Sequence, residues 1–212
     1  MKKILLMLVC LVSMTTVSAK INLGWNVKGG LGLSTWMGGN ADSSEPLFNQ
    51  KLGLGIDLPL TWLISFQTGM YWESKGASIS FEDSALASAG SDKVKVNQNY
   101  LQIPLLAAFH VGTVSNFDLV FTCGPYLAYG LNGKMEASKG DLTVSCNSFG
   151  ESDINGTLFE GLDRFDAGIQ LGAALDFKKC SVGVDSEFSF CKLAEKTKAY
   201  NYGLYFTFGY KF

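Results

Sequence analysis

The residue types that most often carry chemistry are few in this sequence of 212 residues. His110 is its one histidine, so a serine–histidine–carboxylate hydrolase would need that residue as the base. No Gly-x-Ser-x-Gly sequence, which holds the serine in many such enzymes, occurs in the chain. A single histidine among scattered carboxylates also predicts no metal site. We therefore expect no enzymatic activity and no cofactor.

The cysteines follow no known metal or redox spacing. Cys123, Cys146, Cys180 and Cys191 are 23, 34 and 11 residues apart, unlike the close pairs of zinc and thioredoxin-type motifs. In an exported protein they could form disulfides. The spacing leaves open whether they are unpaired thiols or pair incidentally.

Charged residues are the remaining chemical group, and they are balanced. The chain has 17 Lys and Arg against 19 Asp and Glu, which excludes a basic nucleic-acid-binding protein. Eleven of these residues occupy alternate positions of apolar segments, opposite the large side chains: Lys28, Lys51, Asp57, Glu73, Lys75, Asp118, Asp166, Asp176, Asp185, Glu187 and Lys211. If that face is buried, charges of both signs can pair across it.

The segments that carry these charges alternate between apolar and polar or small residues. In the last thirteen residues, every even position from Tyr200 to Phe212 is Tyr, Leu or Phe. A period of two indicates a β-strand with one apolar face. The pattern predicts eight strands, near 21–33, 51–58, 64–73, 101–110, 117–130, 165–177, 181–190 and 200–212.

The predicted connections alternate in length, as in an up-and-down meander. Short ones fall near 59–62, 112–116 and 178–180; longer ones, rich in Gly, Ser, Asp and Asn, fall near 37–48, 78–96 and 134–159, with a shorter fourth at 194–199. The longest, 134–159, could bind a partner, since functional residues concentrate on loops, or could be a solvated loop without that role.

Alternation fits both a soluble barrel with an apolar interior and a membrane barrel with an apolar exterior. The mean hydropathy is +0.17, yet no run reaches the roughly 18 apolar residues of a membrane helix. Glycines on the charged face suit a crowded interior. Aromatic residues on the apolar face form two predicted belts near the strand ends: Trp62, Trp72, Phe109, Phe117, Tyr129, Phe177, Tyr200, Tyr202, Tyr210 and Phe212. Such belts flank the lipid-facing band of outer-membrane barrels.

Both ends of the chain point to export. Lys2 and Lys3, the apolar residues 4–12 and the sequence Val-Ser-Ala at 17–19 predict a signal peptide over residues 1–19, with the barrel domain spanning 20–212. The outward row of the last strand, Phe206, Phe208, Tyr210 and Phe212, resembles the signal that the outer-membrane assembly machinery reads. That machinery and outer-membrane lipid are therefore the expected partners of a monomeric barrel.

Three segments resemble a known family. The sequence Tyr-Leu-Gln-Ile-Pro-Leu-Leu at 100–106 is similar to the Y-L-E-I-P-L-L strand of PorT-like, porin-family outer-membrane proteins of Bacteroidetes, and 27–34 and 165–172 resemble their first and sixth strands. The resemblance implies an eight-stranded outer-membrane barrel. Gln102 stands where the family has Glu, so no role can rest on that carboxylate.

Together these patterns predict an all-β, eight-stranded antiparallel up-and-down transmembrane β-barrel in the outer membrane. We expect a lumen filled by the charged residues and a structural or surface-interaction role, with His110 in the lumen or at the interface. One alternative is a narrow pore or a conduit for small or hydrophobic molecules. The other is a soluble periplasmic barrel that binds an apolar ligand.

Overall fold

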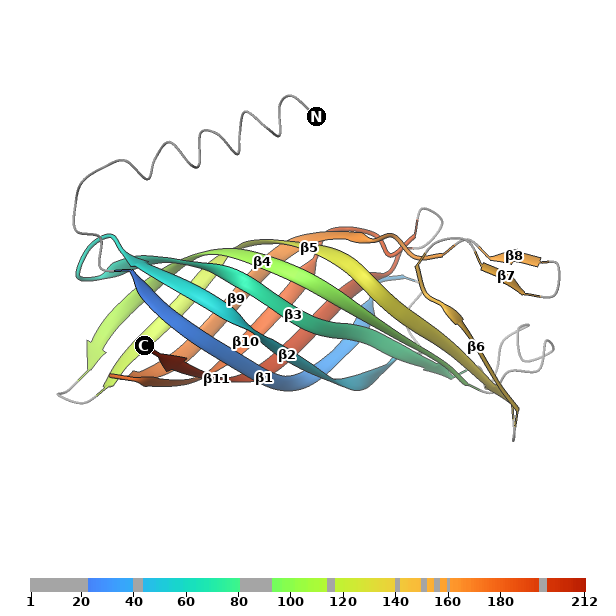
Figure 1. The fold of residues 1–212 in the computed structure, drawn as a ribbon, viewed down its shortest axis with the longest axis horizontal. Helices are drawn as coiled ribbons and strands as arrows, with labels where there is room; N and C mark the ends of the chain where they lie inside the picture. The colour runs from blue at the N-terminus through green and yellow to red at the C-terminus, as the bar shows by residue number, and fades with distance from the viewer. Residues whose placement is uncertain are drawn as a thin grey trace, which may run out of the picture.

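Eight antiparallel strands close into a barrel in the computed structural model of the chain (Figure 1). The structure describes residues 23–39, 44–80, 93–113, 117–139, 142–149, 152–154, 157–159, 161–194 and 198–212. The barrel strands are β1 (Gly24–Met37), β2 (Ser44–Pro59), β3 (Ile64–Ser80), β4 (Lys93–Thr113), β5 (Phe117–Lys139), β9 (Phe165–Phe177), β10 (Cys180–Ser189) and β11 (Tyr200–Lys211). The predicted signal peptide lies outside the described residues.

Each barrel strand pairs with the strands before and after it in the chain, and β1 closes the barrel on β11. The closing register runs from Asn26 opposite Lys211 to Met37 opposite Tyr200. The predicted all-β, eight-stranded up-and-down fold is confirmed. The short connections β2–β3, β4–β5 and β9–β10 lie at one end, beside the C-terminus (Figure 1).

Side chains alternate between the two faces of the wall as predicted. In β11, Phe206 is 61% exposed on the outside, whereas its neighbours Tyr205 and Thr207 are buried inside. The same alternation in β9 exposes Leu171 and buries Gln170. The barrel is therefore apolar outside and polar inside, the reverse of a soluble barrel.

Inward glycines make room for inward aromatic rings. A Cβ atom at Gly168 would lie 2.7 Å from the Tyr126 hydroxyl oxygen, and one at Gly203 would lie 2.7 Å from Cε2 of Tyr205. Both distances are closer than real Cβ contacts, so any larger residue would displace these rings. The glycine content of the charged face thus reflects a crowded interior, as the sequence predicted.

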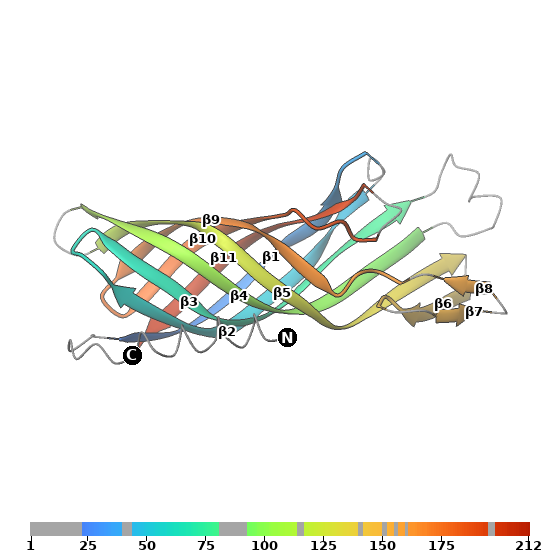
Figure 2. The same ribbon diagram turned by 90° about the horizontal axis from the view of Figure 1, so that it is seen from above.

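The strand ends predicted at the long-loop side are wrong. Strands β3, β4 and β5 continue well past the predicted ends, and the supposed loop 134–159 is mostly β-structure (Figures 1 and 2). Its β6 (Leu142–Asn147) pairs back onto β5, and β7 (Ser152–Ile154) pairs with β8 (Thr157–Phe159). Beyond a bilayer both strand faces can meet water, so apolar alternation is lost while the backbone ladder continues.

The belt residues at the strand ends face outward, with one exception. Phe109, Phe117, Tyr129, Phe177, Tyr210 and Phe212 are exposed, and Trp72, Tyr200 and Tyr202 are half-buried. Trp62, 88% exposed, sits on the β2–β3 turn and lines the barrel mouth. A turn residue leaves the alternation of the strand, so the face of Trp62 does not follow from that pattern.

Candidate functional site inside the barrel

Four buried charged side chains meet at the centre of the lumen. Lys51 comes from β2, Glu73 and Lys75 from β3, and Glu187 from β10. The Lys75 ammonium lies 2.7 Å from a Glu73 carboxylate oxygen and 3.1 Å from one of Glu187. Lys51 lies 3.3 Å from Glu73 and donates a hydrogen bond to Glu187. We call these four residues the central cluster.

Amide side chains complete the coordination of the central cluster. The Gln102 carbonyl oxygen accepts a hydrogen bond from Lys75 at 3.0 Å, and its amide nitrogen donates to Glu187 at 2.9 Å. A glutamate at this position could accept from the lysine, but it could not donate to Glu187 as an ionised group. The neutral Gln102 amide therefore fits between the two charges.

Tyrosine rings fill the space around the two lysines. The Lys75 nitrogen lies 4.3 Å from the ring centroid of Tyr126, and the Lys51 nitrogen lies 5.4 Å and 5.6 Å from the centroids of Tyr71 and Tyr205. Cation–π contacts of this length stabilise a desolvated ammonium. An eight-stranded barrel is just wide enough for side chains to fill, and here they fill it.

A second layer closes the lumen above the central cluster. Phe149 follows β6 and packs its ring edge-on against Tyr100, with centroids 5.7 Å apart. Tyr126, Ala128 and Leu162 complete this apolar plug. The Arg164 guanidinium lies 5.1 Å from the Phe149 centroid and donates to the Gly130 carbonyl at 3.0 Å. The segment after β6 therefore folds into the end of the barrel opposite the short turns.

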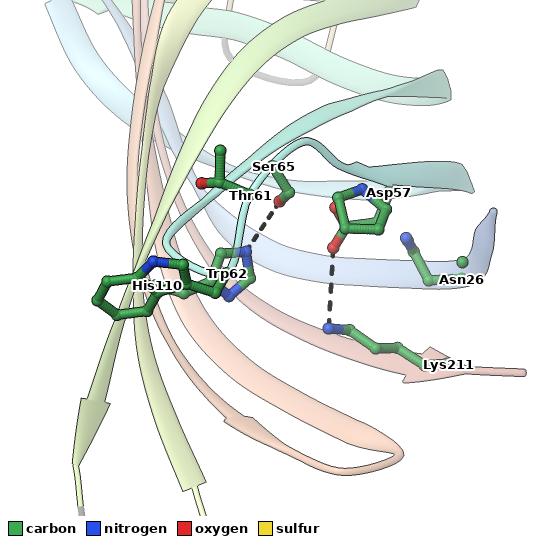
Figure 3. A pocket seen from close by; sticks show the side chains of 9 residues that line it. Asn26, Asp57, Thr61, Trp62, Ser65, His110 and Lys211 are labelled. Carbon is green, nitrogen blue, oxygen red and sulfur yellow. Dashed lines mark hydrogen bonds and ion pairs between the residues drawn. The ribbon is translucent and has the colours of Figure 1, made fainter. Parts of the chain in front are cut away.

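The lower lumen, toward the short turns, is less tightly filled. Lys211 forms an ion pair with Asp176 and lies 3.9 Å from Asp57, while Lys28 lies 3.8 Å from Asp185. A cavity of about 350 Å³ opens at this end. Figure 3 shows its lining: Asn26, Asp57, Thr61, Trp62, Ser65, His110 and Lys211.

The single histidine belongs to this lower cavity. His110 Nε2 lies 2.8 Å from the Ser65 hydroxyl (Figure 3), at the end of the barrel where the sequence placed it. Within the described residues, no group of three or more His, Cys, Asp or Glu side chains is arranged to hold a metal ion. The cysteines at 123, 146, 180 and 191 are unpaired.

The predicted charge network separates into two groups and one outlier. The upper group is the central cluster with Asp166, which lies 3.5 Å from Lys75. The lower group contains Lys28, Asp57, Asp176, Asp185 and Lys211. Asp118 joins neither, because it is exposed at the start of β5. The prediction that Asp118 belongs to the lumen network is wrong: a residue beside the turn meets solvent on either face.

Sequence reasoning missed the residues that make the lumen tight. Tyr71, Tyr126 and Tyr205 stand at inward positions of their strands, and that parity was a usable signal. Phe149 carried no such signal, because it lies in a segment without periodicity.

Comparison with known families decides what kind of barrel this is. A family described as "Outer membrane protein beta-barrel domain" matches residues 16–195. The chain belongs to this outer-membrane barrel family. Its apolar outer face therefore contacts membrane lipid, and the alternative of a soluble periplasmic barrel with an apolar interior is wrong. The described residues include no helix long and apolar enough to cross a membrane.

Several solved structures have a similar chain path. The attachment invasion locus protein Ail of Yersinia pestis is 14% identical, with 89% of this chain and 98% of that chain covered and a TM-score of 0.41. OprG of Pseudomonas aeruginosa is 11% identical, with 91% of this chain and 97% of that chain covered and a TM-score of 0.47. Neisserial surface protein A is 7% identical, with 89% of this chain and 97% of that chain covered and a TM-score of 0.44. No curated protein matches the chain.

Proposed function

We propose that this outer-membrane barrel does not conduct and that it acts through the β-structure beyond its outer end. The observation that carries the proposal is the double closure of the lumen, by the Phe149 plug and by the central cluster beneath it. Lys51, Glu73, Lys75 and Glu187 are each at most 2% exposed. A path for solutes would have to separate these buried ion pairs, and breaking such pairs is costly.

The outer extension offers the surface for an interaction. Strands β3, β4 and β5 project past the other barrel strands, and β6 adds a further strand to β5 (Figure 2). Lys95 and Glu136 lie opposite each other on β4 and β5, and Lys134 is also exposed. A rigid, charged sheet held away from the membrane suits recognition of a polar partner.

A planar-bilayer measurement tests the closed lumen. We expect the refolded wild-type protein to show no steady conductance, and the Phe149→Ala variant to remain closed as well, because the central cluster still blocks the lumen. Steady openings of the wild-type protein would contradict this proposal. They would favour the alternative of a narrow pore, in which the surplus carboxylates of the lumen should make the current cation-selective.

The orientation of the barrel follows from the position of the short turns, which face the periplasm in bacterial outer-membrane barrels. A peptide tag inserted between Lys139 and Leu142, at the tip of the β5–β6 hairpin, should then be labelled by antibody on intact cells. A tag in the short turn at Lys178–Lys179 is the matched control and should be labelled only after the outer membrane is ruptured. The opposite labelling pattern would overturn the topology.

The proposal also includes the expectations from sequence about family, export, assembly and oligomeric state. We infer that the chain lies close to the PorT-like proteins, on the strength of residues 100–106, and that residues 1–19 direct export. The outward row ending at Phe212 supports recognition by the assembly machinery. A monomer is expected, because the barrel has no open edge that needs a partner strand.

A further inference from the structure

The lower lumen is a blind cup. It opens at the short-turn end as the cavity of about 350 Å³ and narrows inward to a space of about 40 Å³ beside Tyr71, whose ring lies under Lys51 of the central cluster. Ion-pair partners from β2, β3 and β10 cross the barrel beyond this narrow part, so in the closed lumen proposed above a molecule that enters from the short turns does not pass through. The cup has the size of a small-molecule binding site.

Several buried acceptor oxygens in this cup lack a donor. Four buried oxygens receive no hydrogen bond: Asn26 Oδ1, Asp57 Oδ1, Asp176 Oδ1 and Asp185 Oδ2. Within the described residues, every buried side-chain atom of the cup without a hydrogen bond is thus an oxygen. Buried polar groups are normally hydrogen-bonded, so the cup is built to receive donors.

The net charge of the cup is negative, which also favours a ligand that donates hydrogen bonds. The charged residues that line the wide and narrow parts of the cup are two lysines, Lys28 and Lys211, and three aspartates, Asp57, Asp176 and Asp185. With His110 neutral, one negative charge is in excess. Asp57 is 91% buried: its Oδ2 accepts from Gln67 at 3.2 Å, while its Oδ1 has no partner. A buried carboxylate oxygen without a donor favours a ligand that carries a positively charged donor group.

The rim adds an aromatic surface. Trp62, which is 88% exposed, lines the opening together with His110 (Figure 3). Lys178 and Lys179 are also exposed at this end, on the β9–β10 turn, where water and salt screen them. An indole face attracts a cation and also packs against its methylene groups. We propose that this cup binds a small aliphatic ligand that carries a primary ammonium group.

Binding of 1,4-diaminobutane to the refolded protein in detergent micelles tests this site. Tryptophan fluorescence and calorimetry should show saturable binding of one diamine per barrel, whereas 1,4-butanediol, its neutral analogue, should not bind. Loss of a charge-assisted hydrogen bond weakens binding on the order of tenfold, and we expect a loss of that size in Asp57→Asn and in Asp185→Asn.

Asp163→Asn is the matched control, because Asp163 is an exposed aspartate at the opposite end of the barrel. It should leave diamine binding unchanged. Each variant must first show the heat-modifiable gel mobility of the folded wild-type barrel. Equal binding of the diol, equal weakening by Asp163→Asn, or no saturable binding of the diamine would each overturn the proposal. These outcomes are independent of conductance and of any partner of the outer extension.

Discussion

Replacing Lys75 with methionine is expected to lower the free energy of unfolding by about 3–5 kcal/mol, the usual cost of removing one partner from a buried ion pair. Lys75 contacts Glu73, Glu187 and Asp166 at 2.7, 3.1 and 3.5 Å. Without its ammonium group, these three carboxylates would share the single charge of Lys51 in a site that excludes water. Urea unfolding of the refolded protein in lipid vesicles, followed by tryptophan fluorescence, measures the change.

Two further variants test whether the loss of stability comes from the burial of the ion pairs. Lys28→Met removes the same charge from the lower lumen, where Lys28 is partly exposed and 3.8 Å from Asp185. It should cost less than Lys75→Met, because it removes one longer ion pair of a partly hydrated lysine, whereas Lys75 is fully buried and contacts three carboxylates. Adding Glu73→Gln to Lys75→Met should recover part of the lost stability, because it removes one uncompensated charge. Similar small losses in both lysine variants would mean that water reaches the central cluster.

The second large effect is expected on the outer face. Phe206 projects outward from the middle of β11, paired with Leu31 and Val184, which also face outward. Phe206→Lys should destabilise the barrel in lipid by about 2–4 kcal/mol, the cost of a lysine near the bilayer midplane. The barrel would be destabilised because the lysine ammonium group loses its water in lipid. Its paired outward neighbours Leu31 and Val184 carry no negative charge that could compensate. The same vesicle unfolding assay applies.

Neighbouring positions provide the controls for this prediction. Thr207→Ser removes one methyl group from the inward face of the same strand and should cost far less, about 1 kcal/mol or below. Phe190→Lys places a lysine just past the end of β10, where a charge near the interface costs about 0–1 kcal/mol. If Phe206→Lys and Thr207→Ser had equal effects, the assignment of faces in β11 would be wrong.

Much of the barrel wall was predictable because a wall between lipid and a packed interior leaves a strict signature. Leu204, Phe206 and Phe208 alternate with Gly203, Tyr205 and Thr207, and that parity identifies both the strand and the face of each side chain. The alternation is lost where both faces of a strand meet the same surroundings. Ser138 and Thr143, which pair across the β5–β6 hairpin, carry no alternation that would distinguish a strand from a loop.

The lumen residues, like the barrel wall, were predictable only as far as local alternation reaches. Parity placed Lys51, Glu73, Lys75 and Glu187 on one face, because inward charges are the exception in apolar strands. It could not show that these four meet, since the distance between residues 51 and 187 depends on how β2 and β10 stagger around the closed barrel. It could not place Asp118 or Trp62 either, because both stand beside turns, where alternation ends.

By itself, the sequence determined the fold class, the number of barrel strands and their faces, since a period of two is a local property. Tertiary structure alone decided which charges pair, how the segment after β6 returns to plug the lumen with Phe149, and which acceptor oxygens of the lower cup are left without a donor. Each of these depends on residues far apart in the chain. Barrel closure sets their separations, and local pattern does not encode them.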